Sequence, residues 1–158
     1  TFLWIYFFDL NEDGVRDICL SSWVLDLGLL GRGAPQVEHK VTGFLSNLGT
    51  WSTRAAFAWS RTFQVDEFES LVSMDTFVAD LTGDGQPNLL ERSTAGSLEI
   101  RRFLPNSNGV KIADEIAAEI PINALQAEVE VLNLNSDGIG DFIVSRDGKL
   151  EIHLSYRR

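Results

Sequence analysis

Three nine-residue segments of this chain share one pattern, and this repetition constrains the fold more than any other feature. Each segment carries an oxygen-bearing side chain at positions 1, 3, 5 and 9, a leucine at position 2 and an Asp-Gly pair at positions 5 and 6. The segments are residues 9–17 (DLNEDGVRD), 80–88 (DLTGDGQPN) and 133–141 (NLNSDGIGD), named loops one, two and three. Because internal self-similarity is the sequence signature of repeat architectures, we expect a chain built from repeated units.

Short apolar stretches flank every loop. Those before the loops are residues 5–8 (IYFF), 76–79 (TFVA) and 129–132 (VEVL), and those after them are residues 18–20 (ICL), 89–90 (LL) and 142–144 (FIV). Their length and their β-branched and aromatic residues are typical of strands. After loops two and three, a turn (94–96 or 147–148) leads into a further strand (97–100 or 149–152). The sequence therefore predicts an all-β fold of three units, at about 1–72, 73–125 and 126–158.

Two segments between the loops allow two interpretations each. Residues 109–120 (GVKIADEIAAEI) are rich in Ala and Glu, as in a helix, but their place in the repeat is that of an outer strand, which we favour. Phe57, Trp59 and Phe63 share one strand parity and predict an aromatic face. That face either packs on a neighbouring sheet or forms a platform for a sugar or a protein partner.

Apolar patterns near both ends of the chain predict strands with buried side chains. The run Phe2–Phe8 (FLWIYFF) predicts a buried strand, is far too short to cross a bilayer and follows no signal-peptide pattern, so no membrane span is expected. Near the other end, alternation predicts a half-buried strand whose polar side, with His153, faces solvent. Its apolar side consists of Leu150, Ile152, Leu154 and Tyr156.

The charge and the cysteine and histidine content exclude several kinds of site. The net charge of −10 argues against binding nucleic acid or an anionic membrane through a basic face, so cations are the more natural partners. Cys19 is the single cysteine, which excludes an internal disulfide and a multi-cysteine zinc site, and its apolar neighbours predict burial. His39 and His153 are far apart in sequence, and neither has a companion at metal-ligand spacing.

Oxygen ligands at alternate positions, with a glycine after the third, are typical of a loop that holds a hard cation such as calcium. In each loop the side chains at positions 1, 3, 5 and 9 and the backbone carbonyl at position 7 are the candidate ligands. They are Asp9, Asn11, Asp13, Val15 and Asp17 in loop one, Asp80, Thr82, Asp84, Gln86 and Asn88 in loop two, and Asn133, Asn135, Asp137, Ile139 and Asp141 in loop three. Loop one has three ligand carboxylates and each other loop has two, so loop one is expected to bind calcium most tightly. The alternative is a set of acidic turns satisfied by backbone amides and water, without metal.

EF-hand and dockerin modules contain loops that begin in the same way. An EF-hand loop ends in a bidentate Glu at position 12, where this chain has Leu20, Glu91 and Val144, so only loop two qualifies. Both modules need a helix after the loop, which Pro87 and the strand-like flanks disfavour. We therefore expect strands on both sides of each loop.

The loops and their flanks resemble FG-GAP/VCBS repeats, the calcium-loop blades of integrin-α-like β-propellers. Loop one matches the family pattern, roughly D-x-D/N-x-D-G-x-x-D, in full, whereas loop two has Thr82 and Asn88 substituted and loop three begins with Asn133. The resemblance implies four-stranded blades in which the calcium loop joins the first two strands. This chain would hold two complete blades and most of a third, as part of a larger propeller. Missing blades or a protein partner would cover the open sheet edge.

From this resemblance we expect a non-catalytic, calcium-binding module that acts as a binding or assembly scaffold in an extracellular, periplasmic or cell-surface setting. The first alternative is an accessory or catalytic part of a secreted hydrolase or lyase acting on sugars or lipids. The chain contains no G-x-S-x-G, H-E-x-x-H or G-x-x-x-x-G-K-[ST] motif, which argues against it. The second alternative is a subunit fixed in a larger complex, with residues 51–63 as its contact.

Overall fold

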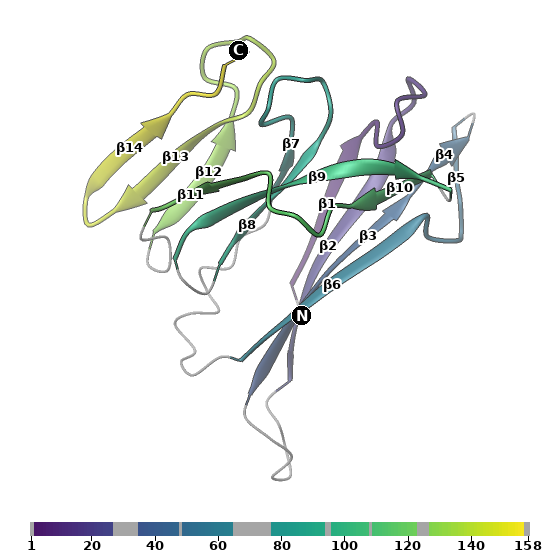
Figure 1. Ribbon diagram of the computed structural model, residues 1–158, viewed down its shortest axis with the longest axis horizontal. Coiled ribbons are helices and arrows are strands. Elements are labelled where there is room, and N and C mark those ends of the chain that lie inside the picture. The colour runs from purple at the N-terminus through teal and green to yellow at the C-terminus, as the bar shows by residue number, and fades with distance from the viewer. Residues whose placement is uncertain are drawn as a thin grey trace. The chain divides into compact units, whose positions relative to one another are not determined.

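All regular structure in the described part of the chain is β-strand. The computed structural model describes residues 2–26, 35–47, 49–64, 77–93, 96–107, 109–122 and 127–156, which confirms the all-β class (Figure 1). Within these residues no helix is long and apolar enough to cross a membrane. In chain order the strands are β1 (Phe2–Phe8), β2 (Asp17–Asp26), β3 (Gln36–Phe44), β4 (Ser46–Asn47), β5 (Thr50–Trp51), β6 (Phe57–Gln64), β7 (Phe77–Ala79), β8 (Asn88–Arg92), β9 (Leu98–Asn106), β10 (Gly109–Ile112), β11 (Ala118–Ile120), β12 (Glu128–Leu132), β13 (Asp141–Arg146) and β14 (Lys149–His153).

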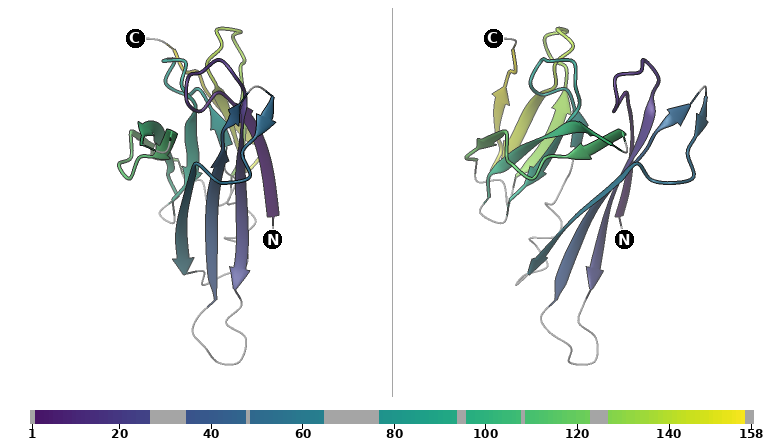
Figure 2. Two further views of the ribbon diagram at one scale, coloured as in Figure 1. Left: turned by 90° about the vertical axis from the view of Figure 1, so that its right-hand side faces the viewer. Right: turned by 45° about the vertical axis from the view of Figure 1, so that its right-hand side comes forward.

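The chain divides into two compact units. The first consists of Thr1–Leu71 and Leu104–Ile112, and the second of Val72–Phe103 and Ala113–Arg158. The main sheet of the first unit, sheet one, has the order β1-β2-β3-β6, and Figure 2 shows these four strands side by side. Loop one joins β1 to β2, which pair antiparallel. Strands β4 and β5 form a separate two-stranded ribbon.

The second unit contains sheet three and most of sheet two, which share a core, whereas β10 and the end of β9 belong to the first unit. Sheet two has the order β10-β9-β8-β7, with β11 also paired to β9, and sheet three has the order β12-β13-β14. Loop two joins β7 to β8 and loop three joins β12 to β13, both antiparallel pairs. Apolar side chains of both sheets form one cluster, whose buried members are Leu81, Leu90, Leu98, Ile100, Ala127, Val129, Phe142 and Val144.

Several predictions of strand and burial are confirmed. The segment 109–120 contains β10 and β11 rather than a helix. Phe57 and Phe63 are buried, which favours the packing role of the aromatic face, while Trp59 is half-buried. Cys19 is fully buried, and this burial raises the pKa of its thiol to about 12.

The predicted burial of residues 2–8 is wrong, although these residues form a strand. Among the described residues β1 pairs only with β2, so it is an edge strand of sheet one. The side chains of Phe2, Leu3 and Ile5 are more than half exposed. An apolar run specifies a strand that is able to be buried, but burial also requires a second layer.

The orientation predicted for the last strand is also wrong. β14 forms as expected, but the side chains predicted to be half-buried are exposed: Leu150, Ile152, Leu154 and Tyr156. His153, predicted to face solvent, is half-buried, and its ring stacks on Phe142 with centroids 4.8 Å apart. The core of the second unit lies on the face of sheet three that contains Phe142, so the histidine faces inward.

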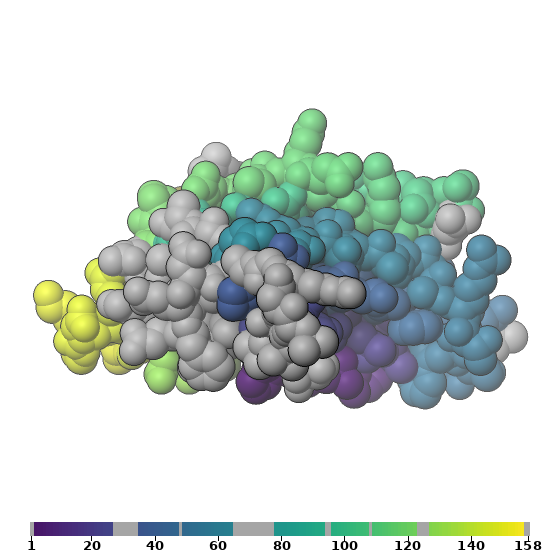
Figure 3. Space-filling view, turned by 90° about the horizontal axis from the view of Figure 1, so that it is seen from below, coloured from purple at the N-terminus to yellow at the C-terminus, as the bar shows by residue number. Residues whose placement is uncertain are grey.

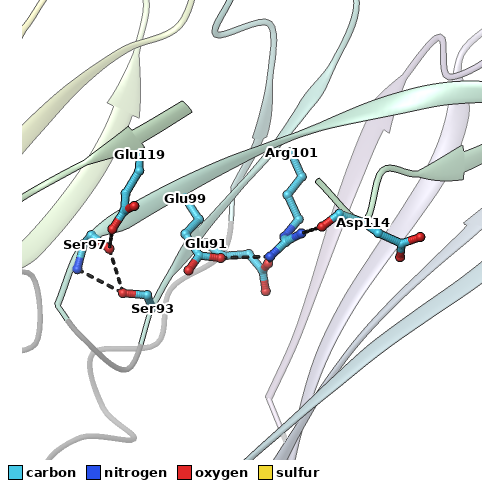
Figure 4. Close-up of polar contacts among 7 residues, drawn as sticks. All are labelled: Glu91, Ser93, Ser97, Glu99, Arg101, Asp114 and Glu119. Atoms are coloured by element: carbon cyan, nitrogen blue, oxygen red, sulfur yellow. Dashed lines mark hydrogen bonds and ion pairs between the residues drawn. The ribbon is translucent and has the colours of Figure 1, made fainter. Parts of the chain in front are cut away.

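The interior of sheet two contains a charged network that no sequence pattern indicated (Figure 4). Arg101 Nε donates to Glu91 at 3.2 Å and its Nη2 to Glu99 at 2.9 Å, and Nη1 also donates to the carbonyl of Asp114. All three charged side chains are buried. Beside them, Ser93 and Ser97 bond to each other, and the Ser97 hydroxyl donates to Glu119.

Replacing Arg101 by Met should destabilise the fold strongly. The substitution leaves two carboxylates buried without their cation, which costs roughly 3–5 kcal/mol in free energy of unfolding. Arg102→Met is the matched control, because its exposed side chain lies next to Arg101 on β9 and should change stability by less than about 0.5 kcal/mol. Urea denaturation measures both values, and equal losses for the two variants would contradict the role of the network.

Candidate metal centre

All three loops adopt the same unusual backbone conformation. The residues at positions 4 and 6 have positive φ in each copy: Glu12 (62°) and Gly14 (80°), Gly83 (74°) and Gly85 (87°), and Ser136 (63°) and Gly138 (87°). Glycine adopts this region without strain, whereas a side chain costs energy there. The two non-glycine residues at position 4 show that the bend persists where the sequence does not favour it.

The side chain at position 9 anchors each loop. One oxygen of Asp17, Asn88 and Asp141 accepts the amide of the leucine at position 2, at 2.8 Å in every copy. All three anchoring side chains are fully buried. A buried amide needs a partner, so this bond fixes the loop entrance against the first residue of the following strand.

In loops one and three the anchor also reaches a residue just beyond the third strand of its sheet. The second oxygen of Asp17 accepts the amide of Ser46 at 2.7 Å, and that of Asp141 accepts the amide of Ser155 at 2.8 Å. In loop two Asn88 has an amide nitrogen instead, and this Nδ2 has no partner among the described residues. Both oxygens of Asp17 and of Asp141 thus accept a backbone amide, whereas Asn88 is only half satisfied.

The carboxylates at positions 1 and 5 accept hydrogen bonds from backbone amides of the loop. Asp9 accepts the amides of Asp13 at 3.1 Å and Gly14 at 2.8 Å. Asp80 accepts those of Thr82, Gly83 and Gly85. No such bond reaches Asn133 within the described residues. Position 5 accepts the amide of position 7 in every copy, in the pairs Asp13 and Val15, Asp84 and Gln86, and Asp137 and Ile139.

In loops one and three the side-chain oxygen at position 3 accepts the amide of position 5. In loop one the Asn11 side chain accepts the Asp13 amide at 3.3 Å and donates to the Asp13 carboxylate at 3.0 Å. Asn135 and Asp137 repeat both bonds in loop three. In loop two the hydroxyl of Thr82 is buried and has no partner among the described residues.

The negative charges of loop one act on one another. Burial is the main cause that raises the pKa of Asp17, and the charges of Asp13 and Asp9 raise it further, while the amides of Ser46 and Leu10 lower it. The ionised anchor is therefore destabilised by its surroundings. A cation bound in this loop would offset that repulsion.

The donors fit a hard cation in kind, because every candidate group is an oxygen. A carboxylate oxygen has two lone pairs, so one that accepts an amide can still coordinate a metal. Loop one brings positions 1 and 3 to a single amide, that of Asp13. Within the part of the chain that is described, however, no group of three or more His, Cys, Asp or Glu side chains is placed to hold a metal ion. The carboxylates are engaged with backbone amides instead, the bonding of the acidic-turn alternative.

The EF-hand alternative fails on two observations. Strands, not helices, follow the loops at β2, β8 and β13. Glu91, the only position-12 residue able to act as the closing ligand, bonds to Arg101. Loop two is therefore not an EF-hand loop.

A serine and a histidine also meet inside sheet one. Ser21 Oγ lies 2.9 Å from His39 Nε2, and both side chains are fully buried. The His39 ring stacks on Trp23 at 4.0 Å and meets Trp59 edge-on at 5.5 Å. This pair has the components of a nucleophile and base, but its burial under aromatic rings denies a substrate access to it.

Comparison with known proteins adds no assignment. No protein-family model matches the sequence, and no curated protein matches it. The resemblance to FG-GAP/VCBS repeats therefore remains a prediction that rests on the three loops and their flanking strands.

Two substitutions in loop three test the shared backbone conformation. Gly138→Ala should lower the free energy of unfolding by about 1 kcal/mol, because φ is 87° there and no atom lies near enough to clash. Ser136→Gly, two residues earlier and equally uncharged, should raise it by roughly 0.5 kcal/mol because φ is also positive there. Urea denaturation measures both, and a loss for Ser136→Gly would contradict the assigned conformation.

Proposed function

We propose that this chain is a calcium-stabilised segment of FG-GAP/VCBS type, a non-catalytic scaffold for binding or assembly in an extracellular, periplasmic or cell-surface setting. The observation that carries the proposal is the threefold recurrence of one loop geometry, each time between the first two strands of a separate antiparallel sheet. In this proposal each sheet is a blade of a larger propeller. Calcium is abundant outside cells, and each bound ion stabilises the fold by mass action.

Calcium would be held by the side chains at positions 1, 3, 5 and 9 and the carbonyl at position 7 of each loop. Its charge would offset the repulsion between Asp9, Asp13 and Asp17. It would also offset the energetic cost of the buried negative charge on Asp17. The buried, unpartnered hydroxyl of Thr82 supports the same role in loop two. The unpartnered Nδ2 of Asn88 is a donor that a cation does not satisfy, so loop two is the weaker site.

A catalytic role is the weaker proposal. The one serine–histidine pair described above is enclosed in the interior of sheet one. His153 stacks on Phe142 and lies 3.8 Å from Glu151. A scaffold needs neither group.

Thermal unfolding in millimolar calcium and in excess chelator tests the metal role. The melting temperature should rise in calcium, since a ligand at one hundred times its Kd adds about 2.7 kcal/mol. Asp13→Asn should lose most of the rise without lowering the melting temperature in chelator, because the amide oxygen can still accept the Val15 amide. Asp84→Asn and Asp137→Asn should each lose a smaller part.

The matched control is Asp114→Asn, which removes an exposed carboxylate outside the loops and should keep the full calcium response. Identical melting of the unsubstituted protein in both buffers would show that the loops are acidic turns. The calcium role would then be withdrawn.

A further inference from the structure

The contact between sheets two and three follows the repeat register, so each sheet has two distinguishable faces. Residues directly opposite on paired strands point to the same face. We name the face that contains loop position 11 the odd face, and the face with positions 10 and 12 the even face. Sheet two presents its odd face to the shared core, through Leu90 at position 11, Ile100 opposite it and Leu98. Sheet three presents its even face, through Phe142, Val144 and Val129.

The odd face of sheet three has apolar residues in the same register, but its β14 side chains are exposed. Ile143 is at position 11 with Ile152 opposite, and Leu150 is opposite Ser145, as Leu98 is opposite Arg92. Ile152 is 60% exposed and Leu150 69%, whereas their counterparts in sheet two are buried. The C-terminal residues that carry this face reach the surface in Figure 3, in yellow.

The loops repeat this difference. Leu81 at position 2 of loop two belongs to the shared core, where Gly140 of loop three approaches it so closely that a Cβ would lie 3.0 Å from the leucine. The Gly140 amide donates to the carbonyl of Asp80 at 2.6 Å. Leu134, the equivalent of Leu81 in loop three, is exposed.

The even face of sheet one is exposed in turn. Its register equals that of the buried even face of sheet three: Ile5 lies opposite Leu20 at position 12, as Val129 lies opposite Val144. Phe7 lies opposite Ile18 at position 10, as Val131 lies opposite Phe142. Ile5 is 53% exposed and Phe7 49%.

We propose that the odd face of sheet three binds the even face of sheet one of a second copy of this chain, head to tail. Each exposed face has apolar side chains in the register of one side of a contact that the protein already makes between sheets two and three. The two faces differ, so each contact is heterologous, and successive contacts yield a closed ring or a filament. One local difference is Arg16 at position 8 of loop one, where loop three has Gly140. A Cβ at Gly140 would lie 3.2 Å from the Asp80 carbonyl oxygen as well as 3.0 Å from Leu81, so loops one and three of two copies must lie further apart than loops two and three do.

The second copy is the occupant that the chain itself specifies. Stacked repeats bury apolar faces against the next repeat. Each of the two exposed faces has the register of one partner in the contact between sheets two and three. This inference rests on the proposed scaffold role but needs no metal in the loops.

Two charge substitutions give a test that distinguishes head-to-tail contact from other association. Ile152→Glu blocks the odd face of sheet three and Ile5→Glu the even face of sheet one, and both side chains are exposed, so folding should persist and circular dichroism checks it. In analytical ultracentrifugation the unsubstituted protein should associate with rising concentration. Each variant alone should be monomeric, and an equimolar mixture should form a 1:1 dimer and nothing larger.

Ile116→Glu is the control, an exposed isoleucine between β10 and β11 that should leave association unchanged. A monomer at every concentration of the unsubstituted protein would overturn the proposal, and so would a dimer of either variant alone, which indicates like faces in contact. Runs in calcium and in chelator separate the two proposals. Association that persists in chelator supports the contact whatever calcium does to melting, and a calcium-dependent melt with a persistent monomer supports only the metal role.

Discussion

One buried hydrogen bond recurs in all three repeats, and the rest of each repeat depends on it. The side chain at position 9 accepts the amide of position 2 and is fully enclosed by the sheet that it begins. This bond joins the start of the loop to its end, so the two flanking strands pair antiparallel in a fixed register. At Asp17 and Asp141 the second oxygen adds a residue beyond the third strand, and one carboxylate then joins three segments of backbone. If one of these buried amides had no partner, the fold would be less stable by the energy needed to remove that amide from water.

This anchor and the proposed metal site place opposite demands on the same residue. Burial and the charges of Asp13 and Asp9 raise the pKa of Asp17, so ionising this carboxylate costs more energy in the fold without a cation than it does in water. The hydrogen bonds from the amides of Ser46 and Leu10 offset part of this cost. A calcium ion would offset more of it, which is why the same geometry suits both a rigid turn and a metal loop.

The sequence predicted what depends on local pattern and failed where a distant layer decides. The Asp-Gly spacing identified the loops, and the apolar flanks identified strands on both sides of each loop, all of which form. The burial of β1 and the orientation of β14 were wrong, because alternation shows which face is apolar but not which face another sheet covers. The pairing of Glu91 with Arg101 depends on the register of two strands, which no motif encodes.

Exposed apolar faces and buried anchors are two consequences of one repeat. Every repeat closes its own loop internally, but its faces require neighbours on both sides. Sheets two and three satisfy one such pair of faces within the chain. The exposed side chains of β1 and β14 belong to the faces that remain.

The number of calcium ions bound per chain is the sharpest test of metal binding by the three loops. Equilibrium dialysis against increasing calcium, followed by metal analysis, counts them without reference to stability. We expect one ion at low calcium, lost in Asp13→Asn, and further ions in loops two and three at higher concentrations. A protein that binds no calcium at millimolar concentrations would contradict this expectation and leave three acidic turns with a purely structural role.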